Sequence, residues 1–147
     1  MKKMMLVLAM IVTIGISGAF ATEENVSKRV LNAFKTEFTT AQDVLWSTGK
    51  NFYKAEFTMN GQRAFAYYST GGELIGVARY ISSLQLPLGL LSNLKNNYSK
   101  YWISDLFELS NSDGTHYYVT LEKSDASMML ESTNGTSWTI YNKKKKV

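Results

Sequence analysis

The sequence has no cysteine, one histidine and one proline among its 147 residues. Without cysteine there is no disulfide, and a zinc site of any familiar spacing cannot be assembled. The sequence also has no phosphate-binding loop, dinucleotide fingerprint or nucleophile elbow. We therefore expect a protein that is not an enzyme and holds no metal or cofactor. Its stability must come from packing, for which nineteen aromatic residues supply apolar area.

The single histidine, His116, is the remaining candidate for acid–base chemistry. It follows Asp113 and Gly114, a pair typical of turns, and opens an expected strand. We favour a structural position at the edge of a loop. A hydrolase centred on His116 and Asp113 is the enzymatic alternative.

The first twenty-one residues have the pattern of a cleavable signal peptide. Lys2 and Lys3 precede an uncharged, largely apolar stretch that ends in Ala19-Phe20-Ala21, the small-x-small pattern of a cleavage site. Cleavage after Ala21 would leave one domain, and we expect a periplasmic or secreted protein with no membrane span after cleavage.

The basic balance of the chain is concentrated at its two ends. The formal net charge is +4, but two lysines belong to the expected signal and four lie at Lys143–Lys146, so residues 22–142 carry about −2. A nucleic-acid partner is therefore not expected. We expect residues 143–147 to form a basic tail that frays into solvent.

Two segments have the periodicity of amphipathic helices. Within residues 23–38 the apolar positions are 26, 30, 31, 34 and 38, which lie on one face of a helix. Within residues 87–98 the apolar positions 87, 90, 91, 94 and 98 give the same stripe after Pro87, which suits a first helical turn.

The rest of the chain alternates with a period of two, which predicts β-strands separated by turn signals such as Asn60-Gly61. The expected strands cover residues 44–46, 52–59, 63–69, 73–81, 102–110, 116–123, 126–133 and 136–141. Shifts of 60 to 64 residues superpose the second helix and its strands on the first set. We therefore predict an α+β fold of two tandem helix plus four-strand antiparallel repeats, about 23–83 and 86–142, forming one curved sheet backed by helices.

Strand alternation also predicts which side chains face away from the helices. In the second half, Tyr117, Val119 and Leu121 are expected to face the helices and Tyr118 to face away. Carried back by 64 residues, this parity predicts an outward face rich in aromatic and basic side chains. The candidate binding residues on it are Phe52, Lys54, Phe65, Tyr67, Arg79 and Tyr118. Such a face is typical of a contact surface, but ordinary sheet-forming aromatics or a homodimer interface would give the same pattern.

Several segments together resemble a known family. They are Ala33-Phe34 to Phe38, Val44-x-Trp46, Tyr53-x-Ala55-x-Phe57, Gly61, Ala66-Tyr67-Tyr68, Gly71-Gly72-Glu73-Leu74-Ile75, Gln85-Leu86-Pro87 and Tyr117-Tyr118-Val119-Thr120-Leu121. This set resembles the exported PepSY-like proteins of the Bacteroidetes, whose fold is similar to that of the β-lactamase-inhibitor protein. The resemblance implies an exported binding or inhibitory module with the repeat architecture described above. It implies no contact residue, because the inhibitor depends on disulfides and loops that this sequence does not reproduce.

These observations lead to one favoured function and one alternative. We expect an exported, non-enzymatic binding module that contacts an unidentified protein or peptide of the cell envelope through the exposed sheet face. The alternative is an inhibitor of a secreted peptidase or β-lactamase.

Overall fold

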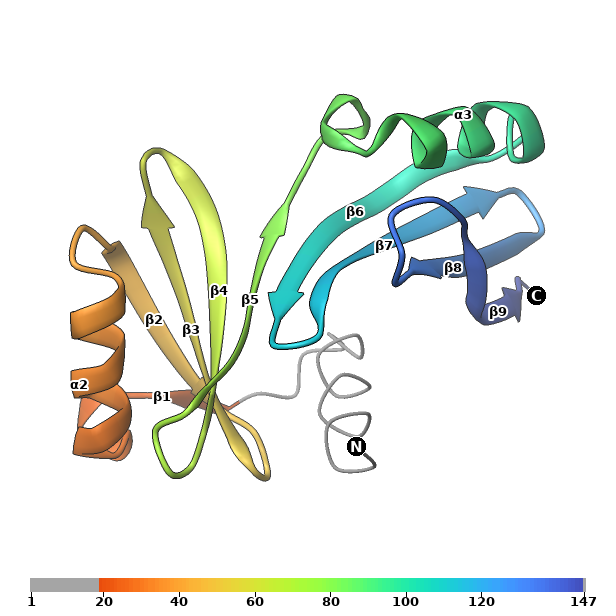
Figure 1. The fold of residues 1–147 in the computed structure, drawn as a ribbon. Helices are drawn as coiled ribbons and strands as arrows, with labels where there is room; N and C mark the ends of the chain where they lie inside the picture. The colour runs from red at the N-terminus through yellow and green to blue at the C-terminus, as the bar shows by residue number, and fades with distance from the viewer. Residues whose placement is uncertain (1–18, 147) are drawn as a thin grey trace.

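The computed structural model describes residues 19–146, and a single antiparallel sheet occupies most of this range (Figure 1). Nine strands follow one another across the sheet in the order in which they occur in the chain. Their bounds are β1 Ala19–Ala21, β2 Gln42–Thr48, β3 Phe52–Met59, β4 Gln62–Ser69, β5 Leu74–Tyr80, β6 Trp102–Asn111, β7 Gly114–Lys123, β8 Ala126–Ser132 and β9 Thr139–Lys145.

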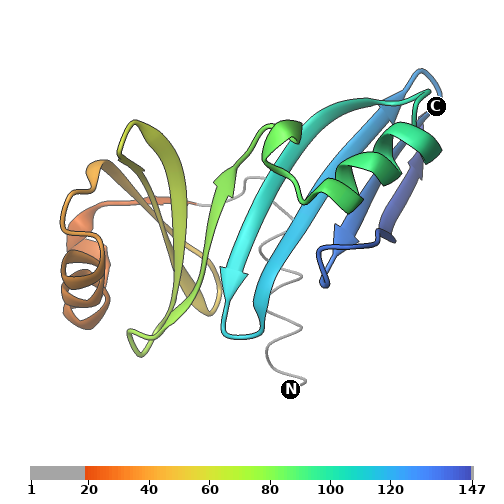
Figure 2. The same cartoon turned by 45° about the horizontal axis from the view of Figure 1, so that its top comes forward.

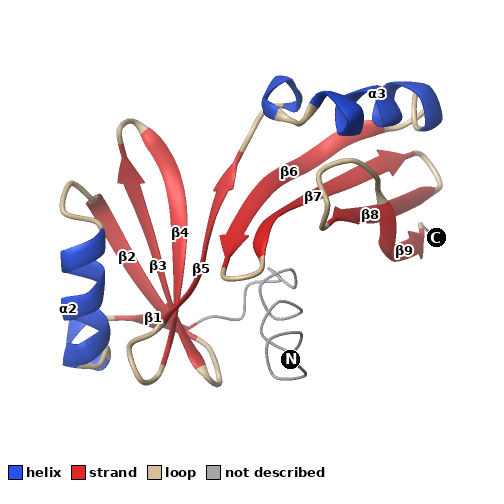
Figure 3. Ribbon diagram, in the orientation of Figure 1, coloured by secondary structure: helices blue, strands red, loops and turns tan. Residues whose placement is uncertain are grey.

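Two α-helices of ten residues pack against one face of this sheet (Figure 3). Helix α2, Lys28–Glu37, begins at Ser27, whose Oγ accepts a hydrogen bond from the amide of Val30 at 3.4 Å. Helix α3, Leu88–Asn97, begins after Pro87. Each follows a 3₁₀ turn, η1 Glu23–Asn25 or η2 Ser83–Gln85, and each buries two residues of its predicted stripe.

The predicted fold class of two tandem helix plus four-strand repeats is wrong. The sheet has no boundary where the repeats would meet, because β5 pairs directly with β6 from Gly76↔Asn111 to Tyr80↔Phe107. A break there would leave the backbone groups of two strand edges without partners, and continuous pairing avoids this cost. Over residues 19–146 the molecule is therefore one extended sheet with two short α-helices.

The turn predicted from Asn60-Gly61 is confirmed. Both residues have positive φ, 52° and 74°, and they join β3 to β4 next to the pair Met59↔Gln62. Two successive positive φ values are characteristic of the tight hairpin turns that match strand twist. This turn fixes the register of the β3–β4 hairpin.

Two apolar clusters lie between the sheet and the helices. Under α2, Phe34 packs edge-on against Trp46 at 5.2 Å and Phe57 at 5.1 Å between ring centroids. Under α3, Leu90 and Leu94 pack on Leu106, Val119, Leu121 and Leu130. We call this side of the sheet the helix side. The sheet bends so that both helices lie outside the bend and the opposite face is concave (Figures 1 and 2).

The four C-terminal lysines do not form the expected frayed tail. Lys143 to Lys145 belong to β9 and pair with β8, from Met128↔Lys143 to Ala126↔Lys145. The Lys146 ammonium forms an ion pair with Glu122 and lies 5.3 Å from the centre of the Trp102 ring. The sequence signal failed here because a lysine run lacks apolar alternation, whereas an edge strand tolerates charge on both faces.

The predicted signal peptide lies mostly outside the described residues. Of residues 1–21 the structure describes only Ala19–Ala21, which form β1 and pair with β2. Within the described range, neither helix is long and apolar enough to cross a membrane.

Candidate binding surface on the concave face

A third apolar cluster lies on the concave face, opposite both helices. Its six buried members come from both halves of the sheet, β4 and β5 on one side and β6 and β7 on the other, and four partly buried side chains pack around them. We call these ten residues the aromatic face: Phe52, Phe65, Tyr67, Ile75, Ala78, Phe107, Leu109, Tyr118, Met129 and Tyr141.

Strand pairing places these side chains together. Directly paired residues project to the same side of a sheet, and Phe65 pairs with Ala78 while Phe107 pairs with Tyr118. The Phe107 and Tyr118 rings are stacked, 5.0 Å apart and 18° from parallel. Rings from β4, β6 and β7 therefore form one continuous apolar surface across the bend.

Charged side chains border the aromatic face in the first half of the sheet. The Lys54 ammonium lies 4.7 Å from the centre of the Phe65 ring, and burial lowers the pKa of this lysine. On the same face Arg63 forms an ion pair with Glu56 at 2.7 Å, whereas Lys54 forms no ion pair with a carboxylate among the described residues.

Tyr118 has the most constrained hydroxyl of the aromatic face. It donates a 2.7 Å hydrogen bond to the Glu131 carboxylate, and its ring meets Tyr141 edge-on at 6.0 Å. Burial, followed by this hydrogen bond, raises the pKa of Tyr118 well above that of a free tyrosine. The hydroxyl is therefore a neutral donor committed to Glu131.

The structure places five of the six predicted binding residues on this face but leaves only two of them partly accessible. Phe65, Tyr67 and Tyr118 are 7%, 2% and 0% exposed, so the expectation of an exposed sheet face is wrong for them. Curvature brings rings from neighbouring strands into contact, so these side chains form a core of their own. Phe52 and Lys54 are half-buried at its border.

Arg79 is on the other side of the sheet. It pairs with Ala64 and Glu108, projects to the helix side, and donates to Glu108 at 2.9 Å and to Gln62 at 3.2 Å. The hydrogen bond to Glu108 raises the pKa of the guanidinium. The cause of the misplacement is a bulge in β5: Tyr68 pairs with Leu74 but Tyr67 pairs with Gly76. One extra residue reverses the facing of every residue that follows it.

Sequence reasoning missed Phe107, Leu109 and Tyr80. The Tyr80 ring meets Phe65 edge-on at 5.5 Å and is 43% exposed, which makes it the most accessible ring beside the aromatic face. The alternation of Leu106 with Phe107 in residues 102–110 is the sequence signal that could have placed Phe107 and Leu109.

His116 is buried, and neither of its ring nitrogens has a hydrogen-bond partner. Asp113 is exposed in the β6–β7 turn, where its amide donates to Asn111 Oδ1 at 2.8 Å. The two side chains are not brought into a hydrogen-bonded pair. Across residues 19–146, no cluster of three or more His, Asp or Glu side chains has a metal-binding arrangement.

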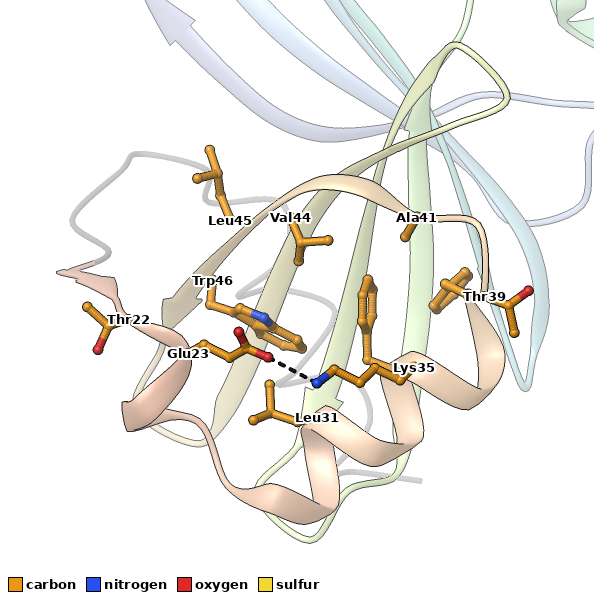
Figure 4. A pocket seen from close by; sticks show the side chains of 11 residues that line it. Thr22, Glu23, Leu31, Lys35, Thr39, Ala41, Val44, Leu45 and Trp46 are labelled. Atoms are coloured by element: carbon orange, nitrogen blue, oxygen red, sulfur yellow. Dashed lines mark ion pairs between the residues drawn. The ribbon is translucent and has the colours of Figure 1, made fainter.

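A separate hollow of about 490 Å³ lies between α2 and β2 (Figure 4). Leu31, Phe34, Val44 and Trp46 line its apolar part, and the ion pair between Lys35 and Glu23, 3.2 Å long, stands at its rim. No sequence-predicted binding residue contributes to it.

Comparison with solved structures identifies the fold. A BLIP-like protein from Bacteroides fragilis superposes with a TM-score of 0.69 at 19% identity, covering 81% of this chain and 85% of that one. A DUF2874 family protein from Bacteroides uniformis gives 0.71 at 16% identity, with coverages of 81% and 88%. A candidate periplasmic protein from Bacteroides eggerthii gives 0.71 at 15% identity, with coverages of 82% and 88%.

At these identities the likeness establishes the fold alone, and the chain has the BLIP-like fold of these Bacteroides proteins. A scan of protein-family models finds no match, and no curated protein matches the sequence.

Proposed function

We propose that this protein is an exported binding module, without enzymatic activity, that contacts a protein or peptide along the border of its aromatic face. The observation that carries the proposal is the composition of that border. Tyr80 is exposed, and Phe52, Lys54 and Tyr141 are half-buried around a packed ring cluster. Accessible aromatic side chains next to a charged one are typical of protein interfaces, and the packed rings beneath hold this border in place.

The border has a chemistry that favours some partners over others. Lys54 holds its positive charge over a ring, whereas Arg63 is already paired with Glu56. A partner that offers a carboxylate to Lys54 and an apolar or aromatic side chain to Tyr80 would satisfy both groups. We infer a peptide segment or loop of this kind as the ligand.

The proposal of export rests on the signal-like start of the sequence and on the likeness to a candidate periplasmic protein. Membership of the PepSY-like proteins is part of the same proposal and rests on the sequence segments that resemble them. Intact-mass measurement of the protein recovered from the cell envelope tests the export step, with Thr22 expected as the first residue. A mass that retains residues 1–21 would contradict it.

The binding proposal is tested by recovery of partners from a cell-envelope extract. We expect Lys54→Ala combined with Tyr80→Ala to weaken capture by about 10-fold or more, because interface anchors of these types each contribute roughly 1–2 kcal/mol. Leu84→Ala is the matched control, since Leu84 is 83% exposed and lies in η2, outside the aromatic face. Equal recovery by all three proteins would refute the proposed surface.

The likeness to a BLIP-like protein favours a second candidate, inhibition of a secreted β-lactamase or peptidase. The purified protein would be assayed against a panel of such enzymes, with the Lys54→Ala and Tyr80→Ala variant in parallel. Inhibition that this variant loses supports the candidate. Absence of inhibition across the panel removes it and leaves the binding proposal in place.

A further inference from the structure

The two edges of the sheet are built differently. At one edge, β9 carries Lys143, Lys144 and Lys145, a charge pattern that discourages another strand from pairing. Toward the other edge, β2 has the sequence Gln-Asp-Val-Leu-Trp-Ser-Thr, with neither lysine nor proline, and its Leu45 is 50% exposed. Asp43, which has a positive φ, and a register shift between Gln42 and Leu45 interrupt the first half of this strand. The second half of β2, Trp46–Thr48, therefore lacks the usual protection against strand addition.

In the structure, β2 already has a short extended partner. Residues Ala19–Ala21 form β1 and pair antiparallel with β2, in the register Ala19↔Thr48, Phe20↔Ser47 and Ala21↔Trp46. These three residues are also the expected cleavage motif of the signal peptide. Cleavage after Ala21 removes the whole of β1 and leaves the backbone groups of Trp46, Ser47 and Thr48 on that edge without a strand partner.

The described part of the molecule has a core and a β2–β3 pairing that do not involve β1. All three apolar clusters consist of residues from Val26 onward, and β2 keeps its pairing with β3 from Gln42↔Thr58 to Thr48↔Tyr53. The domain from Thr22 to Val147 thus retains its core and presents a vacant edge.

The vacant edge adjoins the hollow between α2 and β2. The residue opposite Trp46 lies on the helix side, and a partner strand that continues past Trp46 runs toward Val44, which lines the hollow at the register shift of β2. Leu31, Phe34 and Trp46 form the apolar part of this volume of about 490 Å³, which suits an apolar side chain, and Lys35 and Glu23 pair with each other at its rim (Figure 4).

We propose that the β2 edge of the processed protein is a strand-addition site for an uncharged extended peptide with small and apolar side chains. The peptide pairs antiparallel with Trp46–Thr48 in the register that β1 shows, and it places an apolar side chain in the hollow beside Val44. Backbone hydrogen bonds give such a site its affinity, and the hollow gives it selectivity. The site is distinct from the aromatic face and goes beyond the proposed function.

The test uses the processed protein, Thr22 to Val147, and a synthetic peptide with the sequence of residues 17–21, Ser-Gly-Ala-Phe-Ala, extended by Val-Val to reach the hollow. Amide hydrogen exchange is measured with and without the peptide. We expect the exchange of the Trp46 and Thr48 amides, which point away from β3, to slow by about 10-fold at saturating peptide, because pairing protects edge amides. Unchanged exchange throughout β2 at millimolar peptide would overturn the proposal.

Two controls separate strand addition from general stickiness. Two peptides are N-methylated at alternate residues, one at the odd and one at the even positions, and both keep all side chains. In only one of these two methylation frames do the methyl groups face β2. We expect that frame alone to lose binding, and equal binding of both frames refutes pairing.

Thr48→Lys, which gives β2 the protection of β9, is expected to weaken binding, whereas Asn142→Lys on β9 leaves it unchanged. The Lys54→Ala and Tyr80→Ala variant is expected to bind the peptide normally, so failure at the aromatic face and failure at this edge are distinguishable.

Discussion

Tyr68 shows how a single buried group sets a pH limit for the fold. Its side chain is 1% exposed under α2, and its hydroxyl has no hydrogen-bond partner. Burial, followed by the nearby Glu37 charge, raises the pKa of Tyr68 to about 12, against about 10 for a free tyrosine. Above pH 10 the unfolded chain loses this proton while the folded protein keeps it. Titration of Tyr68 therefore leaves the free energy of unfolding unchanged below pH 10 and lowers it as pH rises toward 12.

We expect Tyr68→Phe to raise stability at pH 7 by up to about 1 kcal/mol, because it removes an unsatisfied buried hydroxyl and leaves the ring in place. It should also reduce the loss of stability between pH 10 and 12. Urea unfolding at pH 7, 10 and 11 measures both effects. Tyr141→Phe is the comparison, since Tyr141 is only half-buried. A Tyr68→Phe protein with the pH profile of the wild type would contradict this assignment.

At the same scale, the sequence predicts facing correctly wherever strand alternation is unbroken. Phe65, Tyr67 and Tyr118 lie on the face expected for them, opposite both helices. Arg79 does not, because the β5 bulge inserts one residue that no local signal marks. The sequence also could not predict the exposed fraction of these side chains, since the burial of Tyr67 depends on how far the whole sheet curves.

Among the elements, β9 differs most from its sequence expectation. Its lysine half pairs with β8, and Lys146 contacts both Glu122 and Trp102. Hydrophobic periodicity predicted the neighbouring strands because they bury one face, whereas β9 buries almost nothing and depends on backbone pairing. A strand that is held only by backbone hydrogen bonds has no alternation of apolar residues from which the sequence could predict it.

Deletion of residues 143–147 is expected to destabilise the protein by about 1–3 kcal/mol, since it removes three ladder pairs and the Lys146 contacts. A frayed tail would predict no change. The free energy of unfolding in urea decides between them. Replacing all four lysines by threonine is the control: it keeps the ladder, so we expect a smaller loss of stability together with self-association that light scattering detects.

For the whole molecule, the aromatic face joins the two halves of the sheet. Phe65 and Tyr67 precede α3, Phe107 and Tyr118 follow it, and Arg79 on β5 bonds Glu108 on β6. We expect one cooperative unfolding transition. In hydrogen exchange across a urea series, β3–β4 and β7–β8 should lose protection at the same urea concentration.

Leu109→Val tests this coupling, because Leu109 is fully buried in the aromatic face. The substitution should cost about 1 kcal/mol and lower both transitions together. A shift confined to β7–β8 would mean that the halves unfold independently.

The strand order has a consequence for how the chain reaches this state. Every strand pairs only with its neighbours in sequence, and the longest interval between paired strands is the segment from Tyr80 to Trp102 that contains α3. Contacts between residues close in sequence are found quickly, since little chain entropy is lost in closing each loop. A polypeptide delivered with its N-terminus first could add each hairpin to the sheet as it emerged, and no strand would have to wait for a distant partner.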